Sequence, residues 1–511
     1  MKFGNIAKAS AVAVVAALAL SACAGGGGTP APTSDGQRGG TLTIGALADV
    51  TSWDPAQAHV GHALQPYQAP YDTLILREPD GTLSPMLATE WSYNEDRTQL
   101  TIDLRTDVTF SDGEVFNADA VQANFDHFKA ANGRQAAQLA AYESTEVVDE
   151  DTVVVTLATP DPAFEYYLSQ AAGLMGSPAA LDTEGISTAP VGSGPYEMDT
   201  QGSVTGSQYT FTAREDYWNP ELQKFDKIVF KVLTDPTARL NALVSGQVDA
   251  TLLDARAIAQ AEGAGKTLTA YQTDWAGLLL MDRDGAQVPA LADVRVRQAI
   301  NHALDRDALL ETLALDQGTT TGQVFGPDSG AFVEEIDDLY PYDPDKAREL
   351  LEDAGFGDGF EFSVPTVPGF ETILAVVGQQ LADVGITMTP QSIPPQNLVS
   401  DLGAGKFPAT FFFLFQGEPW VAINQMISTS ALYNPFDSTT PELQELIDAV
   451  QYGGDESAEL AKEVNRYVTE NAWFAPVYRP DQIFFTDGKK ITVEPQIQQA
   501  VPSIYNFSPI Q

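Results

Sequence analysis

The body of this chain has to be stabilised by its hydrophobic core, because the sequence offers no disulfide. Cys23 is the only cysteine among 511 residues, and a single thiol cannot form an intrachain bridge. Hydrophobic residues make up 44% of the chain and charged residues 19%, which is ordinary globular composition. A chain of this length is expected to fold as two or three domains.

The position of Cys23 predicts how the chain is targeted. Two lysines precede an uncharged apolar run, 9–20, which is too short to span a bilayer as a permanent helix. The run ends in Leu20-Ser21-Ala22-Cys23, which resembles a bacterial lipobox. We therefore predict a signal peptide over 1–22 and lipidation of Cys23. The alternative is a buried or free cysteine that follows an ordinary signal.

Residues 23–40 are predicted to form a flexible tether. They contain four consecutive glycines and two prolines, with no apolar periodicity that could build a core. A coil of this composition reaches roughly 20 to 25 Å over about 17 residues. A lipid on Cys23 would then hold the folded body at the extracytoplasmic face of the cell membrane, at a cell surface or in a periplasm.

The charge balance excludes some partners. Seventy acidic against 27 basic side chains give a formal net charge of −43. Phosphate backbones are bound by clustered Lys and Arg, so we expect no nucleic acid partner. A polybasic membrane patch is absent too, which leaves Cys23 as the predicted membrane attachment. The acidity itself is typical of a solvated, soluble surface.

Periodicity predicts an α/β architecture. Three Asp-Pro or Thr-Pro pairs are placed to begin helices with an apolar stripe: Asp235-Pro236, Asp343-Pro344 and Thr440-Pro441. Strand-like segments follow or alternate with them, at 248–253, 386–389 and 411–415. The last of these, Phe411 to Phe415, has the form of a strand covered on both faces. Helix and strand in repeated succession indicate α/β folding.

The stretch 77–189 is predicted to be mixed. Alternating apolar residues mark strands near 100–104 and 153–157, and the first strand of the body is expected near 39–44. Asn117 is placed to cap a helix in which Val121, Phe125 and Phe128 share one face.

The sequence lacks the arrangements that catalysis needs. It has four histidines and no cysteine in the body, so zinc-ligand spacings and a cysteine nucleophile are absent. Gly192-Ser193-Gly194-Pro195 reads as a tight turn, because Pro195 removes an amide donor that an anion nest would use. We therefore expect no cofactor, no metal and no enzymatic activity. A cell-surface hydrolase and a structural adhesin remain the alternative classes.

Two of the histidines are candidates for ligand contact. His59 and His62 lie three apart after the first predicted strand, and open α/β sheets bind ligands beyond the carboxyl ends of strands. The alternative is that they are surface or packing residues. His127 and His302 fall on predicted helices and are expected to be structural.

Five motifs in order carry a resemblance to a known family. They are Asp80 to Trp91, Leu104 to Gly113, Pro190 to Tyr196 with Asp216-Tyr217-Trp218 after it, Asp293 to Ile300, and Ala303 to Arg306. Together they make the mature chain similar to the family 5 extracytoplasmic solute-binding proteins of ABC importers. That family includes dipeptide, oligopeptide and nickel binders.

The resemblance implies a bilobed, periplasmic-binding-protein-like fold of two α/β lobes, a hinge, and an extra α+β domain inserted in the first lobe. The first lobe would comprise 41–76, 190–282 and 478–511. The inserted domain would be 77–189, and the second lobe 283–477.

The resemblance also suggests where a solute binds. In peptide-binding members an aspartate shortly after the aromatic strand of the second lobe meets the peptide's amino group. Here that stretch reads Phe413-Leu414-Phe415-Gln416-Gly417-Glu418-Pro419-Trp420. Glu418 could take the aspartate's place, with an exposed loop glutamate as the alternative. No Lys or Arg stands within 411–420, so capture of a carboxylate by that strand is in doubt.

Family geometry would bring a set of aromatic residues to the lobe interface, where rings offer large contact area. They are Trp53, Trp275, Trp420 and Tyr433; core packing is the alternative for each. With Phe413, Gln416, Glu418, His59 and His62 they make up the predicted ligand site. Such a site favours a neutral or cationic solute with apolar parts, such as a short peptide, although an oligosaccharide would also suit stacked rings.

The resulting expectation is a monomeric, lipid-anchored capture protein. It would bind a small solute between its lobes and deliver it to an ABC permease in the membrane.

Overall fold

The structure is a computed structural model that describes residues 38–510. The predicted signal peptide, Cys23 and the tether as far as Gln37 lie outside the described residues. Within 38–510, none of the helices is both long and apolar enough to cross a membrane.

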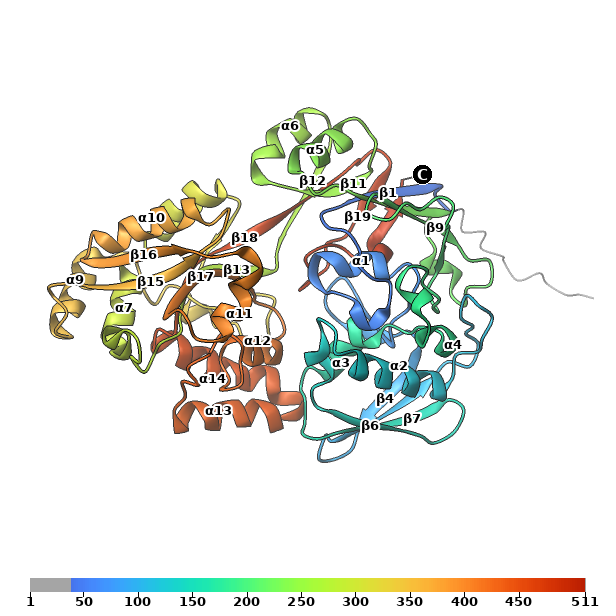
Figure 1. Cartoon of the computed structure of the whole chain (residues 1–511), viewed down its shortest axis with the longest axis horizontal. Helices are drawn as coiled ribbons and strands as arrows, with labels where there is room; N and C mark the ends of the chain where they lie inside the picture. The colour runs from blue at the N-terminus through green and yellow to red at the C-terminus, as the bar shows by residue number, and fades with distance from the viewer. Residues whose placement is uncertain (1–37, 511) are drawn as a thin grey trace, which may run out of the picture. The chain divides into compact units, whose positions relative to one another are not determined.

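A ten-stranded mixed sheet organises the chain (Figure 1). Eight strands lie in the order β17-β13-β18-β11-β1-β10-β9-β8, and β12 and β14 also pair with β18. Their bounds are β1 (Thr41–Ala46), β8 (Tyr196–Met198), β9 (Gln208–Ala213), β10 (Lys227–Val232), β11 (Ala250–Leu253), β12 (Thr267–Gln272), β13 (Asp274–Leu280), β14 (Gly318–Thr320), β17 (Ala409–Phe415) and β18 (Phe474–Thr486).

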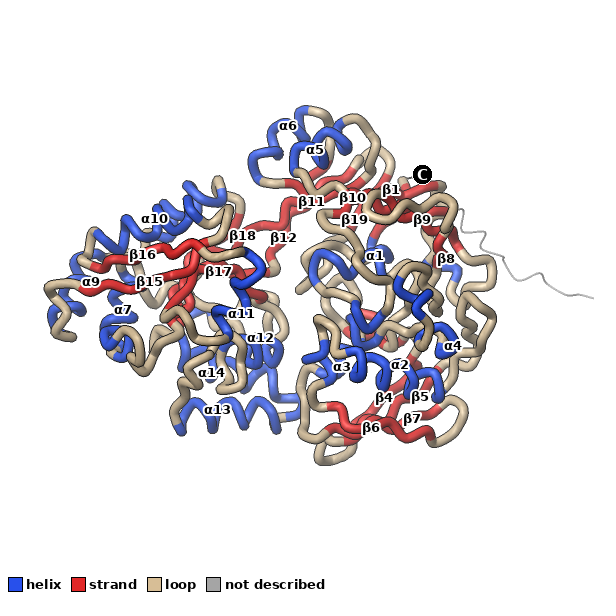
Figure 2. Tube along the Cα trace, in the orientation of Figure 1, coloured by secondary structure: helices blue, strands red, loops and turns tan. Residues whose placement is uncertain are grey.

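The long strand β18 joins two parts of this sheet. Its first half pairs with β13 and β14, while its second half pairs with β11 and β12. Only Thr273 separates β12 from β13. Two adjacent antiparallel segments, 267–280 and 474–486, therefore run from the β1 side of the sheet to the β17 side, which is the arrangement of a two-strand hinge (Figure 2).

The fold is the bilobed α/β fold that the sequence predicted. The domain bounds themselves remain a prediction. We keep the names first lobe, inserted domain and second lobe for the residue ranges given above.

In the first lobe, helices pack beside strands β1, β11 and β12. Its helices are α1 (Leu64–Tyr67), α5 (Pro236–Val244) and α6 (Ile258–Gly263). Asp235 caps α5, accepting from the Ala238 amide at 2.7 Å, and Gly246 follows with a left-handed φ of +75°. Short strands β19 (Ile491–Val493) and β20 (Phe507–Pro509) pair near the end of the chain.

The inserted domain carries a four-stranded antiparallel sheet in the order β4-β5-β7-β6. The strands are β4 (Ala88–Tyr93), β5 (Gln99–Leu104), β6 (Tyr142–Val147) and β7 (Thr152–Leu157). A separate pair, β2 (Ile75–Arg77) and β3 (Leu83–Pro85), lies across the border with the first lobe. The helices are α2 (Ala118–Ala131), α3 (Phe164–Leu168) and α4 (Pro178–Leu181). Asn117 caps α2 as predicted, accepting from the Ala120 amide at 3.0 Å, and Val121, Phe125 and Phe128 are buried.

The second lobe carries strand β17, which pairs with β13 of the hinge, and a parallel pair, β15 (Phe360–Thr366) and β16 (Ile386–Ser392). Its helices are α7 (Val294–His302), α8 (Arg306–Leu309), α9 (Pro344–Asp353), α10 (Glu371–Ala382), α11 (Leu398–Gly403), α12 (Pro419–Met426), α13 (Pro441–Tyr452) and α14 (Ser457–Glu470). Asp343 and Thr440 cap α9 and α13 as predicted.

One sequence expectation needs correction. Strand β17 is not covered on both faces: Phe411 and Leu414 are buried, but Phe412, Phe413 and Phe415 keep part of their surface exposed.

The glycines of the segment 192–195 allow close packing. A Cβ on Gly194 would lie 2.4 Å from the Tyr71 nitrogen.

Candidate functional site

Polar groups gather where β17 ends in the second lobe. Gln416 is 4% exposed. Its backbone amide donates to the Thr273 carbonyl at 3.2 Å, and its backbone carbonyl accepts from the Gly326 amide at 2.9 Å. Its side-chain Oε1 is buried without a hydrogen-bond partner. A buried acceptor left free in this way is a place where a donor from a ligand or water gains a hydrogen bond.

Glu418 lies two residues further on, at the N-terminus of α12. Its Oε2 accepts from the Val421 amide at 2.7 Å. Burial raises the pKa of Glu418 to about 7; the Val421 and Trp420 amides act in the lowering direction, and the Asp161 carboxylate adds to the rise. The predicted alternative, an exposed loop glutamate, does not describe this half-buried side chain.

The Glu418 carboxylate affects the pKa of two tyrosines in the inserted domain. Burial raises the pKa of Tyr166 in α3, the Arg77 guanidinium lowers it, and the Glu418 carboxylate raises it. The neighbouring Tyr167 also has its pKa raised by burial, with Asp161 and Glu418 contributing. One tyrosine hydroxyl therefore lies within Coulombic range of a guanidinium from the inserted domain and a carboxylate from the second lobe.

A small hollow lies beside the hinge between the two lobes. Gln272, Thr273, Gln416 and Gln498 are among its lining residues. Gln498 crosses it, donating to the Asp328 carbonyl at 3.1 Å. The side chains around it are mostly polar.

The two candidate histidines have different surroundings. His62 is exposed beside the hinge, with Nε2 3.3 Å from Gln482 Oε1, and Gln482 in turn donates to Thr273 at 3.2 Å. Burial raises the pKa of Asp274 and the His62 ring lowers it. His59 is also exposed, and its Nδ1 lies 2.6 Å from the Val60 carbonyl oxygen. Only His62 lies near the hinge groups.

The aromatic residues of the predicted site are packed inside the lobes. Trp53 is 2% exposed against Tyr67, Tyr209 and Phe211, and Trp275 is fully buried against Phe474. Trp420 and Tyr433 are each 5% exposed. These four rings offer almost no surface to a solute in this conformation, so their role in binding stays a prediction.

Phe413 is different, because it is only half-buried. It packs edge-on to Phe370 and Phe411. The remaining histidines have structural partners: His127 pairs with Asp54 at 2.9 Å, and His302 Nδ1 lies 2.8 Å from the Pro341 carbonyl oxygen.

Sequence reasoning missed Arg77, Tyr166 and Tyr167. One signal for Arg77 was present, since it shares a strand face with Ile75 and therefore had to be a buried charge. Nothing local marked the tyrosines, because their importance depends on a residue far away in the chain.

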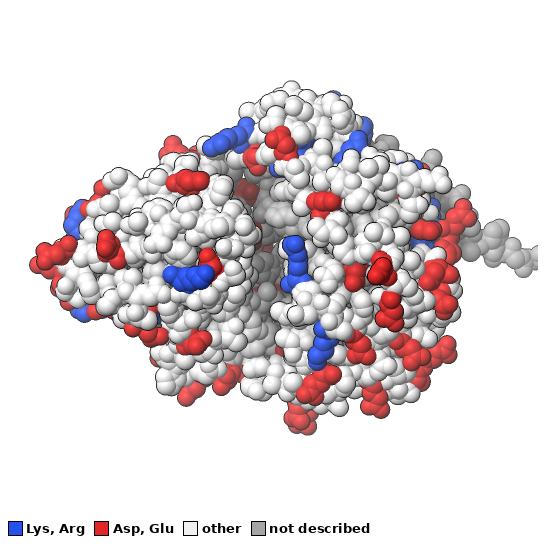
Figure 3. Space-filling view, in the orientation of Figure 1, with Lys and Arg blue, Asp and Glu red and all other residues white. Residues whose placement is uncertain are grey.

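The described residues hold no cluster of His, Cys, Asp or Glu that could bind a metal ion. Acidic side chains are spread over the visible face rather than collected into one patch (Figure 3).

Comparison with known families gives a direct match. Residues 82–433 match the model of the bacterial extracellular solute-binding proteins, family 5 Middle. The glutathione-binding protein GsiB of Escherichia coli strain K12 is 32% identical over 364 residues, which covers 68% of each chain.

Solved structures share the fold. The ABC transporter substrate-binding protein CtaP of Listeria monocytogenes superimposes with a TM-score of 0.79 at 21% identity, covering 93% of this chain and 100% of that one. The periplasmic binding protein DppA of Helicobacter pylori, in complex with the peptide STSA, gives a TM-score of 0.77 at 20% identity over 94% of this chain and 100% of that one. The family match and the identity to GsiB show that this protein belongs to the family 5 bacterial extracellular solute-binding proteins, the solute-binding components of ABC importers.

Proposed function

We propose that this protein captures a peptide-like solute that carries a protonated amine and delivers it unchanged to the membrane permease of an ABC importer. The observation that carries the proposal is the pair of acceptors after β17. Gln416 Oε1 is buried without a partner, and Glu418 is a half-buried carboxylate with no ion pair among the described residues. Both accept hydrogen bonds, and an ammonium group supplies three donors.

Relatives support the same class of solute. GsiB is named for binding glutathione, which is itself peptide-like, and DppA has been solved with a bound tetrapeptide. The GsiB identity extends over two thirds of this chain, whereas the likeness to DppA supports only the shared fold.

Calorimetric titration tests the proposal with glutathione and a panel of di- to tetrapeptides, each with its N-acetylated form. We expect at least one free peptide to bind and its acetylated form to bind about 10- to 100-fold more weakly, because an amide nitrogen cannot replace the charged donor. Glu418→Gln should remove most of this discrimination. Glu445→Gln, which removes an exposed carboxylate of α13, is the charge-matched control.

Equal affinity for free and acetylated peptides would reject capture of the amine. Recovery of the peptide in altered form would instead indicate an enzyme, since a transport binder returns its solute intact.

We also propose that lipid on Cys23 holds the protein at the extracytoplasmic face of the membrane. The lipobox-like sequence supports this, and Cys23→Ser should release the mature protein into the soluble fraction. Unchanged membrane retention of that variant would reject the anchor.

A further inference from the structure

Gln498 has an unusual backbone conformation. It lies in the loop 494–503, between the short strands β19 and β20, and has a φ of +58°. Residues other than glycine rarely adopt this left-handed conformation, because the Cβ comes too close to the following carbonyl oxygen. Such a conformation persists where the surrounding contacts enforce it, so the contacts of Gln498 indicate what it does.

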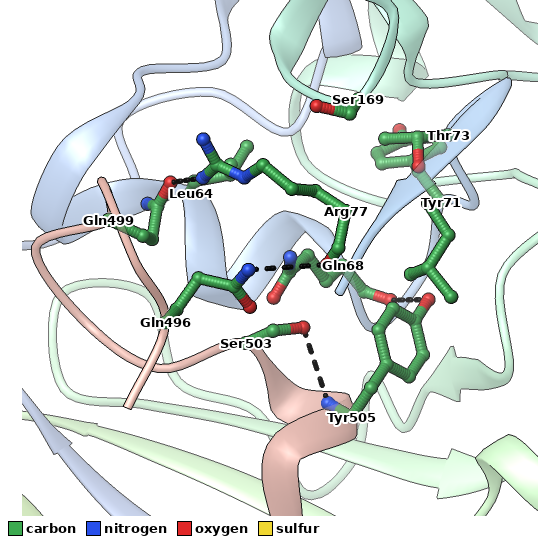
Figure 4. Close-up of a pocket in the computed structure, with 11 residues that line it drawn as sticks. Leu64, Gln68, Tyr71, Thr73, Arg77, Ser169, Gln496, Gln499, Ser503 and Tyr505 are labelled. Atoms are coloured by element: carbon green, nitrogen blue, oxygen red, sulfur yellow. Dashed lines mark hydrogen bonds between the residues drawn. The ribbon is translucent and has the colours of Figure 1, made fainter. Parts of the chain in front are cut away.

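The neighbours of Gln498 in the loop are bound to the first lobe and to the β2–β3 pair. Gln499 accepts from Arg77 Nη2 at 2.7 Å (Figure 4). Gln499 also donates to the Gly61 carbonyl at 2.9 Å, and the Ile497 amide donates to the Pro79 carbonyl at 2.9 Å. The loop is therefore expected to move with the first lobe.

Gln498 contacts the second lobe instead. Its side-chain Nε2 donates to the Asp328 carbonyl at 3.1 Å. The side chain also lies against the backbone that follows β17, because a Cβ on Gly417 would lie 2.7 Å from Gln498 Cγ. Among the residues that the structure describes, no other hydrogen bond joins this loop to the second lobe.

The acceptor belongs to a turn that is bonded to the candidate solute site. The Gly326 amide donates to the Gln416 carbonyl at 2.9 Å, and the Ser329 amide donates to the Gly326 carbonyl at 2.9 Å. A Cβ on Gly326 would lie 2.6 Å from Gln416 Cδ, so the turn packs directly on that side chain. Gln498 therefore connects the first lobe to the part of the second lobe that holds Gln416.

We propose that Gln498 is a latch between the lobes. Its amide holds the loop 494–503 of the first lobe to the turn 326–329 of the second lobe, and so favours the described arrangement of the lobes before a solute binds. A hydrogen bond to a neutral carbonyl contributes modestly, so the latch shifts the equilibrium between open and closed lobes without fixing it. It does not depend on which solute is captured, and so goes beyond the proposed function.

Pulsed electron paramagnetic resonance on the solute-free mature protein tests the latch. Spin labels at Glu143→Cys in β6 and Glu445→Cys in α13, both exposed positions, report the distance between the inserted domain and the second lobe. Cys23→Ser leaves the chain without another thiol. Gln498 is changed to glycine, which adopts a left-handed φ without strain, and to glutamate, which keeps the length but has no donor when ionised.

Both Gln498→Gly and Gln498→Glu should raise the ratio of longer to shorter label distances about 2- to 10-fold, because each removes the hydrogen bond between the lobes. Asn132→Gly is the control, since it removes an exposed amide at another left-handed position, with a φ of +45°. It should leave the distances unchanged. In calorimetry, both Gln498 variants should weaken every peptide that binds by a similar factor and keep the ratio of free to acetylated affinities.

Unchanged label distances in both Gln498 variants would overturn the latch. A change in Gln498→Gly alone would assign the effect to the backbone, and a change in Gln498→Glu alone would assign it to the added charge; either result would also overturn the latch. The distances are measured without solute, so a protein that fails the test of amine capture can still show the latch. Failure of the latch would likewise leave amine capture unaffected.

Discussion

Glu418 is the residue on whose charge solute capture depends in this account. Because burial raises its pKa to about 7, the carboxyl becomes protonated as the pH falls below neutrality and can no longer pair with an ammonium group. We predict that affinity for an amine-bearing peptide falls below about pH 7, by at most about tenfold per pH unit. Titrations between pH 5 and 8 measure this.

The Glu418→Gln variant should bind weakly with a nearly flat profile over the same range. Glu445→Gln should keep the wild-type slope. A wild-type affinity that does not change between pH 5 and 8 would separate Glu418 from the amine.

His127 links the inserted domain to the first lobe through its contact with Asp54. The hydrogen bond to Asp54 raises the pKa of His127 above 6.5, against the effect of burial. A raised pKa means that the pair stabilises the fold fully below about pH 6.5 and that this contribution is lost as the pH rises through the higher folded-state value. We predict that His127→Gln destabilises the protein more at pH 5.5 than at pH 8.5.

Urea unfolding at the two pH values measures the difference. His59→Gln, at an exposed histidine, is the control and should show no such pH dependence. An equal loss for His127→Gln at both values would show that the contact acts without its charge.

For single residues, the sequence could predict a role only where a local motif indicates it. Glu418 and Gln416 were predicted because they follow the aromatic strand. Arg77 and Tyr166 were not, because their meaning comes from a contact between segments far apart in the chain. The buried tryptophans were predicted to line a cleft because family geometry brings their segments to the lobe interface and their rings offer large contact area, a property that core packing also uses.

Among the elements, strand β13 of the hinge depends on a close backbone approach. A Cβ on Gly277 would lie 2.4 Å from the Ala475 carbonyl oxygen and 2.6 Å from the Pro476 Cα. We predict that Gly277→Ala destabilises the protein by about 1–3 kcal/mol, because the two strands must move apart. Thermal or urea unfolding measures the loss.

Gly263, at the end of α6, is the control position, since nothing lies within 4 Å of the Cβ that alanine would add. Gly263→Ala should be neutral or stabilising, by up to about 1 kcal/mol. Similar losses for both variants would contradict the close approach at Gly277.

Element prediction worked best where capping chemistry is local. Asp235, Asp343 and Thr440 each cap the helix that their sequence pattern predicted. The apolar pattern of strand β18 falls into separate pieces, near Tyr478 and over 483–486. The polar stretch 479–482 interrupts its apolar pattern because the strand there passes between the lobes, an arrangement that local sequence does not encode.

At the scale of the whole molecule, the inserted domain and the second lobe touch through a few polar contacts. Arg97 pairs with Asp455 at 3.0 Å, and Gln451 donates to the Pro160 carbonyl at 3.2 Å. Asp455 is 96% exposed, so solvent screens this pair strongly. We predict that Asp455→Asn lowers solute affinity by less than about fivefold, and that the difference vanishes at 1 M salt.

Calorimetry at low and high salt measures that effect. A loss as large as that of Glu418→Gln would mean that the contact, and not the solute, holds the lobes together.

The central claim is that a solute bound between the lobes favours their closed arrangement, because it gains contacts with both that neither lobe alone provides. Small-angle scattering of the protein with and without a peptide that calorimetry has shown to bind tests this most directly. The account predicts a smaller radius of gyration with the peptide present. Superimposable scattering profiles at saturating peptide would contradict it.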